Sequence, residues 1–132
     1  NCTFSVMKKI ALIILLLLSN FIFSQSKSEI GKYLESSNME DLVKHFGESL
    51  ELSILNKSGV YNIVQAKVLL TNFFTAYPPE KYFVKHLGGN PSKKYYEIGK
   101  LLSSKGNFRT YFLYDIVKGE VQIIELRIEI TD

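Results

Sequence analysis

Cysteine and tryptophan are almost absent from this chain of 132 residues, which has one cysteine, no tryptophan and three prolines. The single cysteine, Cys2, precedes Met7, which we expect to be the true start of the protein. A mature domain without cysteine excludes disulfide bonds, thiolate zinc sites, cysteine nucleophiles and a lipid-modified N-terminal cysteine. Such a domain depends on its apolar core, and the length predicts one domain.

The chain also lacks a strong excess of charge of either sign. Its formal net charge is +3, and Lys8 and Lys9 lie in the first ten residues, so 14 basic and 13 acidic residues remain for the rest. A protein that binds nucleic acid needs clustered lysine and arginine to neutralise phosphates. We therefore expect no nucleic-acid partner.

Sequence motifs for metal, phosphate or nucleophilic chemistry are missing as well. There is no H-E-x-x-H, and His45 and His86 lie 41 residues apart. Gly99-Lys100 is followed by leucine, which excludes a P-loop, and Glu51 occupies the place of the second glycine of a nucleophile elbow. We expect no metal and no cofactor.

The N-terminal segment does contain a long apolar run. Lys8 and Lys9 precede nine consecutive apolar residues (10–18), and the stretch ends at Ser24 and Gln25. This layout predicts a secretory signal peptide cleaved after Ser24, so that residues 1–24 are an upstream extension plus signal peptide and residues 25–132 form a single domain. The alternative is a membrane anchor, which needs about 20 apolar residues to cross a bilayer.

The first half of the mature chain predicts helices and one strand pair. Residues 28–36 carry apolar side chains at helical spacing, and Asn38 is suited to cap a second short helix that Gly47 would end. Residues 51–56 predict a strand, closed by a turn at residues 57–59 and followed by a short returning strand at residues 60–61.

A longer helix is predicted over residues 63–77. Asn62 and Gln65 have the spacing of a capping box, and Pro78 ends the helix because the residue before proline avoids the helical region. Its apolar residues form one wide stripe that must be buried: Ile63, Ala66, Leu69, Leu70, Phe73, Phe74 and Tyr77.

After residue 79 the apolar spacing changes to that of strands. Residues 82–87, 94–102, 108–116 and 121–130 are rich in β-branched and aromatic residues, and short turns separate them. These segments predict an antiparallel meander of four strands. In the last strand, alternation places Ile124, Leu126, Ile128 and Ile130 on one face and Ile123, Glu125, Arg127 and Glu129 on the other.

The predicted fold is α+β, with N-terminal helices and one long helix packed on a curved antiparallel sheet that ends in this meander. The order of elements resembles the cone-shaped fold of the nuclear-transport-factor-2-like (cystatin-like) superfamily. An ordered set of stretches also resembles an exported family of Bacteroidota, the domain of unknown function numbered 4783, over residues 28–129: Leu52-Ser53-Ile54, Gly59-Val60-Tyr61, Gln65-Ala66, Phe73-Phe74, Tyr96-Glu97-Ile98-Gly99, Gly106-Asn107-Phe108-Arg109-Thr110-Tyr111 and Ile124-Glu125-Leu126-Arg127-Ile128-Glu129.

This resemblance implies export to the periplasm or outer envelope of a Gram-negative bacterium. It implies no particular activity, because the superfamily includes isomerases, cyclases and dehydratases beside many domains without catalysis. The residues therefore have to indicate the function.

Five residues are candidates to line a ligand pocket. They are Tyr61, His86, Tyr96, Arg109 and Tyr111. A histidine inside the cone could bind a ligand or move a proton, and a covered guanidinium needs either an anionic ligand or an acidic partner, here Glu97 or Glu125. Each candidate also has a structural alternative: a histidine satisfied by backbone, a structural ion pair, or a packed tyrosine with a wet hydroxyl.

The expected function is a non-catalytic module that binds a small ligand or an envelope protein. The alternative is a small isomerase- or lyase-like enzyme acting on an apolar metabolite, with Glu97, Asp115 or His86 as acid or base. We also expect no stable membrane insertion after cleavage. At most a weak homodimer is expected, formed through the outer face of the last strand with apolar area around Ile123 and an ion pair of Arg127. The alternative is a monomer on which this charged face is ordinary solvated surface.

Overall fold

The computed structural model describes residues 2–19 and 28–131 of the chain. The predicted cleavage point after Ser24 lies outside the described residues. The elements are α1 (Cys2–Ser19), α2 (Glu29–Glu35), α3 (Met39–Leu42), the 3-10 turn η2 (Val43–His45), β1 (Phe46–Ile54), β2 (Lys57–Asn62), α4 (Ile63–Ala76), β3 (Pro79–Gly89), β4 (Lys94–Ser103), β5 (Gly106–Val117) and β6 (Glu120–Ile130).

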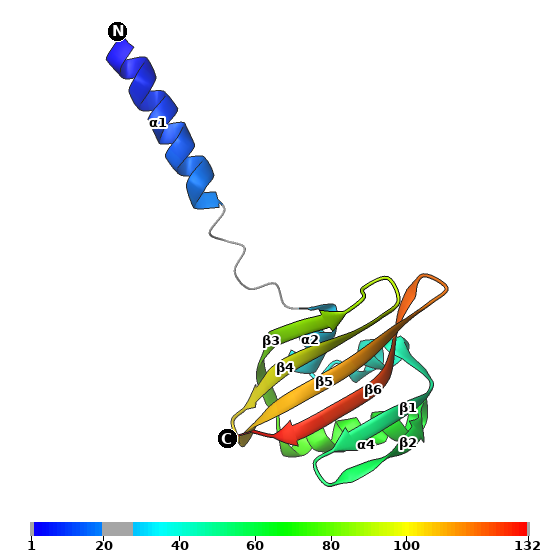
Figure 1. The fold of residues 1–132 in the computed structure, drawn as a ribbon. Coiled ribbons are helices and arrows are strands. Elements are labelled where there is room, and N and C mark those ends of the chain that lie inside the picture. The colour runs from blue at the N-terminus through cyan, green and yellow to red at the C-terminus, as the bar shows by residue number, and fades with distance from the viewer. Residues whose placement is uncertain (1, 20–27, 132) are drawn as a thin grey trace.

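One sheet of six strands, in the order β2-β1-β6-β5-β4-β3, carries helices α2, α3 and α4 on one face (Figure 1). The pairs β3–β4, β4–β5 and β5–β6 are antiparallel, which confirms the predicted meander. The strand β1 lies parallel to β6, so the sheet is mixed at this one pairing, where the expected sheet was antiparallel. The α+β class is confirmed.

The helix ends follow their capping residues. Ser28 accepts a hydrogen bond from the backbone of Gly31 at the start of α2, and Asn38 accepts one from Asp41 at the start of α3. Both hydrogen bonds of the capping box between Asn62 and Gln65 form at α4. These caps satisfy amide groups that the first helical turn leaves unpaired.

The first strand pair departs from the prediction. Gly47 does not end a helix, because β1 already begins at Phe46, and Gly47 is buried within that strand. The turn consists of residues 55–56, and the predicted turn residues Lys57, Ser58 and Gly59 belong to β2. The hairpin is therefore tighter, and both of its strands are longer, than turn composition indicated.

The core lies between the sheet and the three helices. The stripe of α4 is buried at Ala66, Leu70, Phe73 and Phe74, as predicted, while Ile63 is exposed. From the sheet, the same core receives Leu50, Leu52, Tyr82, Leu101, Phe108, Phe112, Tyr114, Ile123, Leu126 and Ile128.

The face of β6 changes partway along the strand. Leu113 pairs with Glu125 whereas Tyr114 pairs with Ile123, so the register shifts by one residue at Ile124. A bulge of this kind inserts an unpaired residue and reverses the alternation on one side of it. Ile123 is consequently fully buried, and its predicted place on the outer face is wrong. It supplies no apolar area to a dimer.

Among the residues that the structure describes, including those of α1, no helix has the length and hydropathy needed to cross a membrane.

Candidate functional site: a groove between the first hairpin and helix α4

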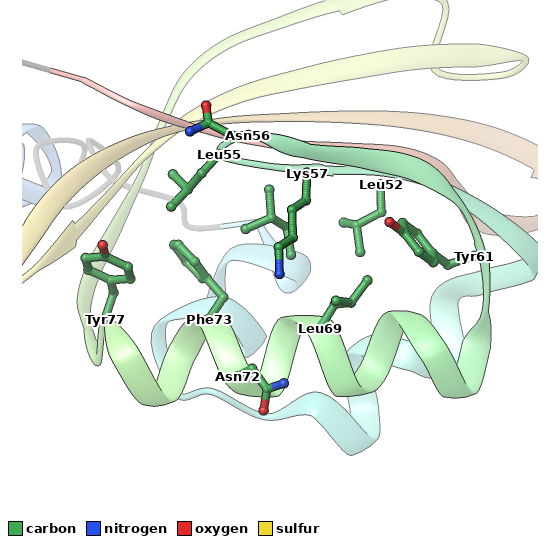
Figure 2. A pocket seen from close by; sticks show the side chains of 10 residues that line it. Leu52, Leu55, Asn56, Lys57, Tyr61, Leu69, Asn72, Phe73 and Tyr77 are labelled. Carbon is green, nitrogen blue, oxygen red and sulfur yellow. The ribbon is translucent and has the colours of Figure 1, made fainter.

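A partly open cavity of about 380 Å³ lies between the β1–β2 hairpin and α4 (Figure 2). Ligand pockets in proteins are commonly clefts of about 300–1,000 Å³ lined mainly by apolar side chains. The residues lining this groove are Leu52, Ile54, Leu55, Asn56, Lys57, Tyr61, Leu69, Asn72, Phe73 and Tyr77. It is large enough for a small ligand.

The periodicities of strand and helix explain why these side chains meet. On β1, Leu52 and Ile54 are two residues apart and share the face toward the helices. On α4 and at the C-cap that follows it, three lining residues recur every four positions along one side of the helix: Leu69, Phe73 and the C-cap residue Tyr77. The apolar walls of the groove therefore come from β1 and α4, and in the sequence only the strand β2 and its turn lie between these two elements.

The aromatic wall of the groove is fixed by ring contacts. The ring centroid of Phe73 lies 5.0 Å from that of Phe108 and 5.2 Å from that of Tyr77, and Tyr77 lies 4.9 Å from Phe108. Such edge-to-face and tilted pairs are favourable geometries for aromatic side chains. The groove is thus preformed on this side.

The hairpin supplies the charge of the groove. Lys57, the first residue of β2, pairs with Ile54 of β1 and runs from the strand toward α4 (Figure 2). Of the ten residues that line the groove, Lys57 alone is charged near neutral pH. The lining of the groove is mainly apolar, with one cation, two asparagines and two tyrosines.

The five predicted pocket residues do not meet in one place. Tyr61 lines the groove. The other four are on the sheet face away from the helices: His86, Tyr96, Arg109 and Tyr111. Successive residues of a strand point to opposite faces of the sheet. Phe108 and Thr110, the neighbours of Arg109, are buried beneath the helices, so Arg109 points to the outer face.

On that outer face the aromatic rings form a row. The ring of Tyr96 lies 5.7 Å from His86 and 5.9 Å from Tyr111, and the guanidinium of Arg127 lies 5.7 Å from the Tyr111 ring. Cations commonly stack on aromatic faces in this way. These contacts give the tyrosines and His86 a packing role on the surface.

Arg109 forms an exposed ion pair at 3.6 Å with Glu129, so the predicted partners Glu97 and Glu125 are both wrong. Glu125 is instead the partner of Arg127, at 2.5 Å. Exposed pairs of this kind contribute about 0–1 kcal/mol to stability.

The carboxylate of Glu97 lies on the opposite, inner face and is almost fully buried, with 2% of its surface exposed. Its Oε2 accepts hydrogen bonds from the Tyr82 hydroxyl at 2.5 Å and from the Ser28 hydroxyl at 2.9 Å. A buried carboxylate needs such donors to offset the loss of water. Glu97 thereby ties the start of α2 to the sheet.

The three candidates for acid–base chemistry are not assembled into a site. Glu97 is on the inner face, His86 is exposed on the outer face, and Asp115 is opposite Lys94 near one end of the β4–β5 pair. None of the three belongs to the lining of the groove. Within the described residues, no three His, Cys, Asp or Glu side chains gather as a metal ion would require.

Two buried tyrosines surround Glu97, and burial raises the pKa of both above the ordinary value. For Tyr82 and for Tyr114 the loss of water is the largest cause, followed by the nearby charge of Glu97. The Tyr114 hydroxyl is buried without a hydrogen-bond partner among the described residues, whereas Tyr82 donates to Glu97.

We expect the protein to lose stability steeply in alkali. Above about pH 10 an unfolded tyrosine releases its proton while the folded chain keeps it, so the free energy of unfolding falls by about 1.4 kcal/mol per pH unit for each such tyrosine. Denaturant unfolding measured between neutral pH and pH 11 checks this. Tyr82→Phe and Tyr114→Phe should each reduce the slope, and slopes equal to that of the unaltered protein would contradict the assignment.

At neutral pH the same two variants should differ. Tyr82→Phe removes a donor from buried Glu97 and should cost about 1.5–3 kcal/mol. Tyr114→Phe removes a hydroxyl that has no partner, so its cost should be near zero.

Sequence reasoning missed the residues that give the groove its character. The composition of Lys57-Ser58-Gly59 predicts a turn, and the apolar pattern before it places Leu55 within the preceding strand. The two-residue spacing between Lys57, Gly59 and Tyr61 was the available signal, because it places all three on one face of a returning strand.

Comparison with known proteins places the domain in a family. A family model described as a domain of unknown function, DUF4783, matches residues 27–129. The chain belongs to this family. A crystal structure of a DUF4783 protein from Bacteroides uniformis is 27% identical, with a TM-score of 0.73, covering 78% of this chain and 94% of that one. A DUF4783 protein from Bacteroides ovatus is 21% identical, with a TM-score of 0.74, covering 82% and 97%.

More distant structures share the fold of this DUF4783 domain. An NTF2-like protein of unknown function from Cytophaga hutchinsonii is 14% identical, with a TM-score of 0.56, covering 78% of this chain and 84% of that one. A protein with a cystatin-like fold from Nostoc punctiforme is 10% identical, with a TM-score of 0.60, covering 77% and 83%. The resemblance to the DUF4783 family is thereby confirmed, and the expected cone-shaped fold is shared with these more distant structures. No curated protein matches the chain.

Proposed function

We propose that this DUF4783 domain is a non-catalytic binding module that holds a small apolar ligand in the groove between the β1–β2 hairpin and α4. The observation that carries the proposal is the cavity of about 380 Å³ with a preformed wall of Leu69, Phe73 and Tyr77. Apolar surface of this kind stabilises a bound ligand by about 25 cal/mol for each Å² removed from water.

The arrangement of acids and bases supports binding rather than catalysis. An isomerase- or lyase-like reaction would need an acid or base facing the ligand. The carboxylate of Glu97 is instead engaged by Tyr82 and Ser28, away from the groove, and His86 is on the other face of the sheet.

The N-terminal segment supports a location outside the cytoplasm. Lys8 and Lys9 followed by the apolar run of residues 10–18 have the layout of a signal peptide. We propose that the domain meets its ligand in the periplasm or outer envelope.

Blocking the groove tests the proposal. Leu69→Trp places an indole among the lining residues and should weaken binding of the neutral apolar dye N-phenyl-1-naphthylamine by about tenfold or more, because a tenfold change is only 1.4 kcal/mol. Fluorescence titration of the dye measures the affinity.

Val68→Trp is the matched control, since Val68 is the preceding residue of α4 and is 54% exposed. It should leave dye binding unchanged. The chain has no tryptophan, so each variant carries a single indole whose emission reports whether that position is shielded. If the dye fails to bind the unaltered protein, or binds both variants equally well, the groove is not a ligand site.

A further inference from the structure

The groove contains a lysine, Lys57, that forms no ion pair with any residue in the described part of the chain. The described residues form ion pairs at Lys44, Lys67, Arg109 and Arg127, but none at Lys57. Its ammonium group points toward α4, between the side chains of Phe73 and Leu69 in the view of Figure 2. A cation beside apolar walls is complementary to an anion that carries an apolar body.

The residue that begins the hairpin turn is held in an unusual conformation beside this lysine. Leu55 has a φ of 53°, in the left-handed region that bulky residues rarely adopt. Its amide donates to the carbonyl of Ile128 at 2.9 Å, which fixes the backbone there, and its side chain points into the groove (Figure 2). Such strain persists where surrounding contacts enforce it, and it is frequent at sites that hold ligands.

The charged and the buried apolar side chains of the groove come from different elements. Lys57 enters from the exposed edge strand β2, whereas Leu52 is buried on β1 and Phe73 is buried on α4. A ligand with its charge at one end can place that end on Lys57 and its body against the two buried side chains. A ligand charged at both ends would bury one charge without a partner.

We propose that the ligand of this site is an apolar carboxylic acid, whose carboxylate pairs with Lys57 and whose hydrocarbon part lies against Leu52, Leu69 and Phe73. The inference rests on the proposed function, because it names the chemical class of the ligand for the same groove.

The test compares decanoate with decanol, which have the same chain length but differ in charge. Each competes with N-phenyl-1-naphthylamine for the unaltered protein, for Lys57→Gln and for Lys85→Gln. Lys85 is an exposed lysine on β3, at the opposite edge of the sheet, and serves as the control. Decanoate should bind the unaltered protein about fivefold more tightly than decanol, which is the upper range for a partly exposed ion pair.

Lys57→Gln should remove this preference, lowering the affinity for decanoate about fivefold and leaving that for decanol unchanged. Lys85→Gln should leave both affinities as they are. Three results would overturn the carboxylate proposal. The unaltered protein could bind decanoate and decanol equally well, Lys57→Gln could keep the preference for decanoate, or neither compound could displace the dye. Failure of the dye itself to bind would instead overturn the proposed function, so the two failures are distinguishable.

Discussion

Replacing Phe73 by alanine should lower the free energy of unfolding by about 3–5 kcal/mol, a large part of the stability of a small domain. The Phe73 side chain is 5% exposed and its ring contacts Phe74, Tyr77 and Phe108. Its removal leaves a cavity at the centre of these contacts, and the surrounding backbone of α4 and β5 can only partly close it. Denaturant unfolding at neutral pH measures the loss.

Val68→Ala on the same helix is the control and should change the free energy of unfolding by less than about 0.5 kcal/mol, because Val68 is largely exposed. It is a cleaner control than Lys67, whose ammonium pairs with Glu40 of α3. Similar unfolding midpoints for Phe73→Ala and Val68→Ala would show that the core does not lie beneath this side of α4.

Replacing Gly99 by alanine should destabilise the protein by about 3 kcal/mol, through overpacking and the disturbed hydrogen bond of Tyr82. A Cβ atom built on Gly99 would lie 2.2 Å from the hydroxyl oxygen of Tyr82 and 2.4 Å from the ring carbon that bears it. The ring has little room to move, since a Cβ on Gly31 would also lie 2.4 Å from it and its hydroxyl is bonded to Glu97.

Gly119→Ala is the comparison for this variant. Gly119 has a φ of +78° and no atom within 4 Å of the added Cβ, so its cost is conformational and should be about 1 kcal/mol. Thermal and denaturant unfolding of the two variants separate the causes. If Gly99→Ala cost no more than Gly119→Ala, the Tyr82 ring would not be confined as described.

Local features of the sequence were sufficient to predict most of the elements. The caps Asn38 and Asn62 and the stripe that includes Phe73 act within a few residues, so α3 and α4 begin where predicted. The meander was also predictable, because short turns join neighbouring strands and leave little choice of partner.

Contacts between distant residues were not predictable in the same way. The parallel pairing of Leu52 with Leu126 joins segments from opposite ends of the domain, and no local pattern specifies it. The bulge at Ile124 likewise depends on the partner strand β5, yet it decides whether Ile123 faces the core or the solvent. An alternation rule applied to β6 alone therefore gives the wrong face for that residue.

The candidate site was predicted in part, for the same physical reason. Tyr61 was expected in a pocket and lines the groove, because β2 pairs with β1 in a register that turns Tyr61 toward α4. His86, Tyr96, Arg109 and Tyr111 have the residue types of a binding site, but the side of the sheet that each occupies depends on which residues of the same strand pack beneath the helices. The sequence of a single strand does not decide between its two faces when both carry aromatic residues.

The parallel pairing of β1 with β6 has a consequence for the order of folding. Strands β3 to β6 are adjacent along the chain and can pair through short turns, whereas β1 finds its partner only after most of the domain lies between them. The β1–β6 pairing closes a long loop, and this step is slow because the chain loses entropy before any contact offsets the loss. During synthesis β6 is also the last of the six strands to be made. Until then Leu50 and Leu52 have only the β1–β2 hairpin and α4 to pack against, so we expect a newly made chain to leave them partly exposed to aggregation. We therefore expect the docking of the β1–β2 hairpin onto β6 to be the last step in the assembly of the sheet.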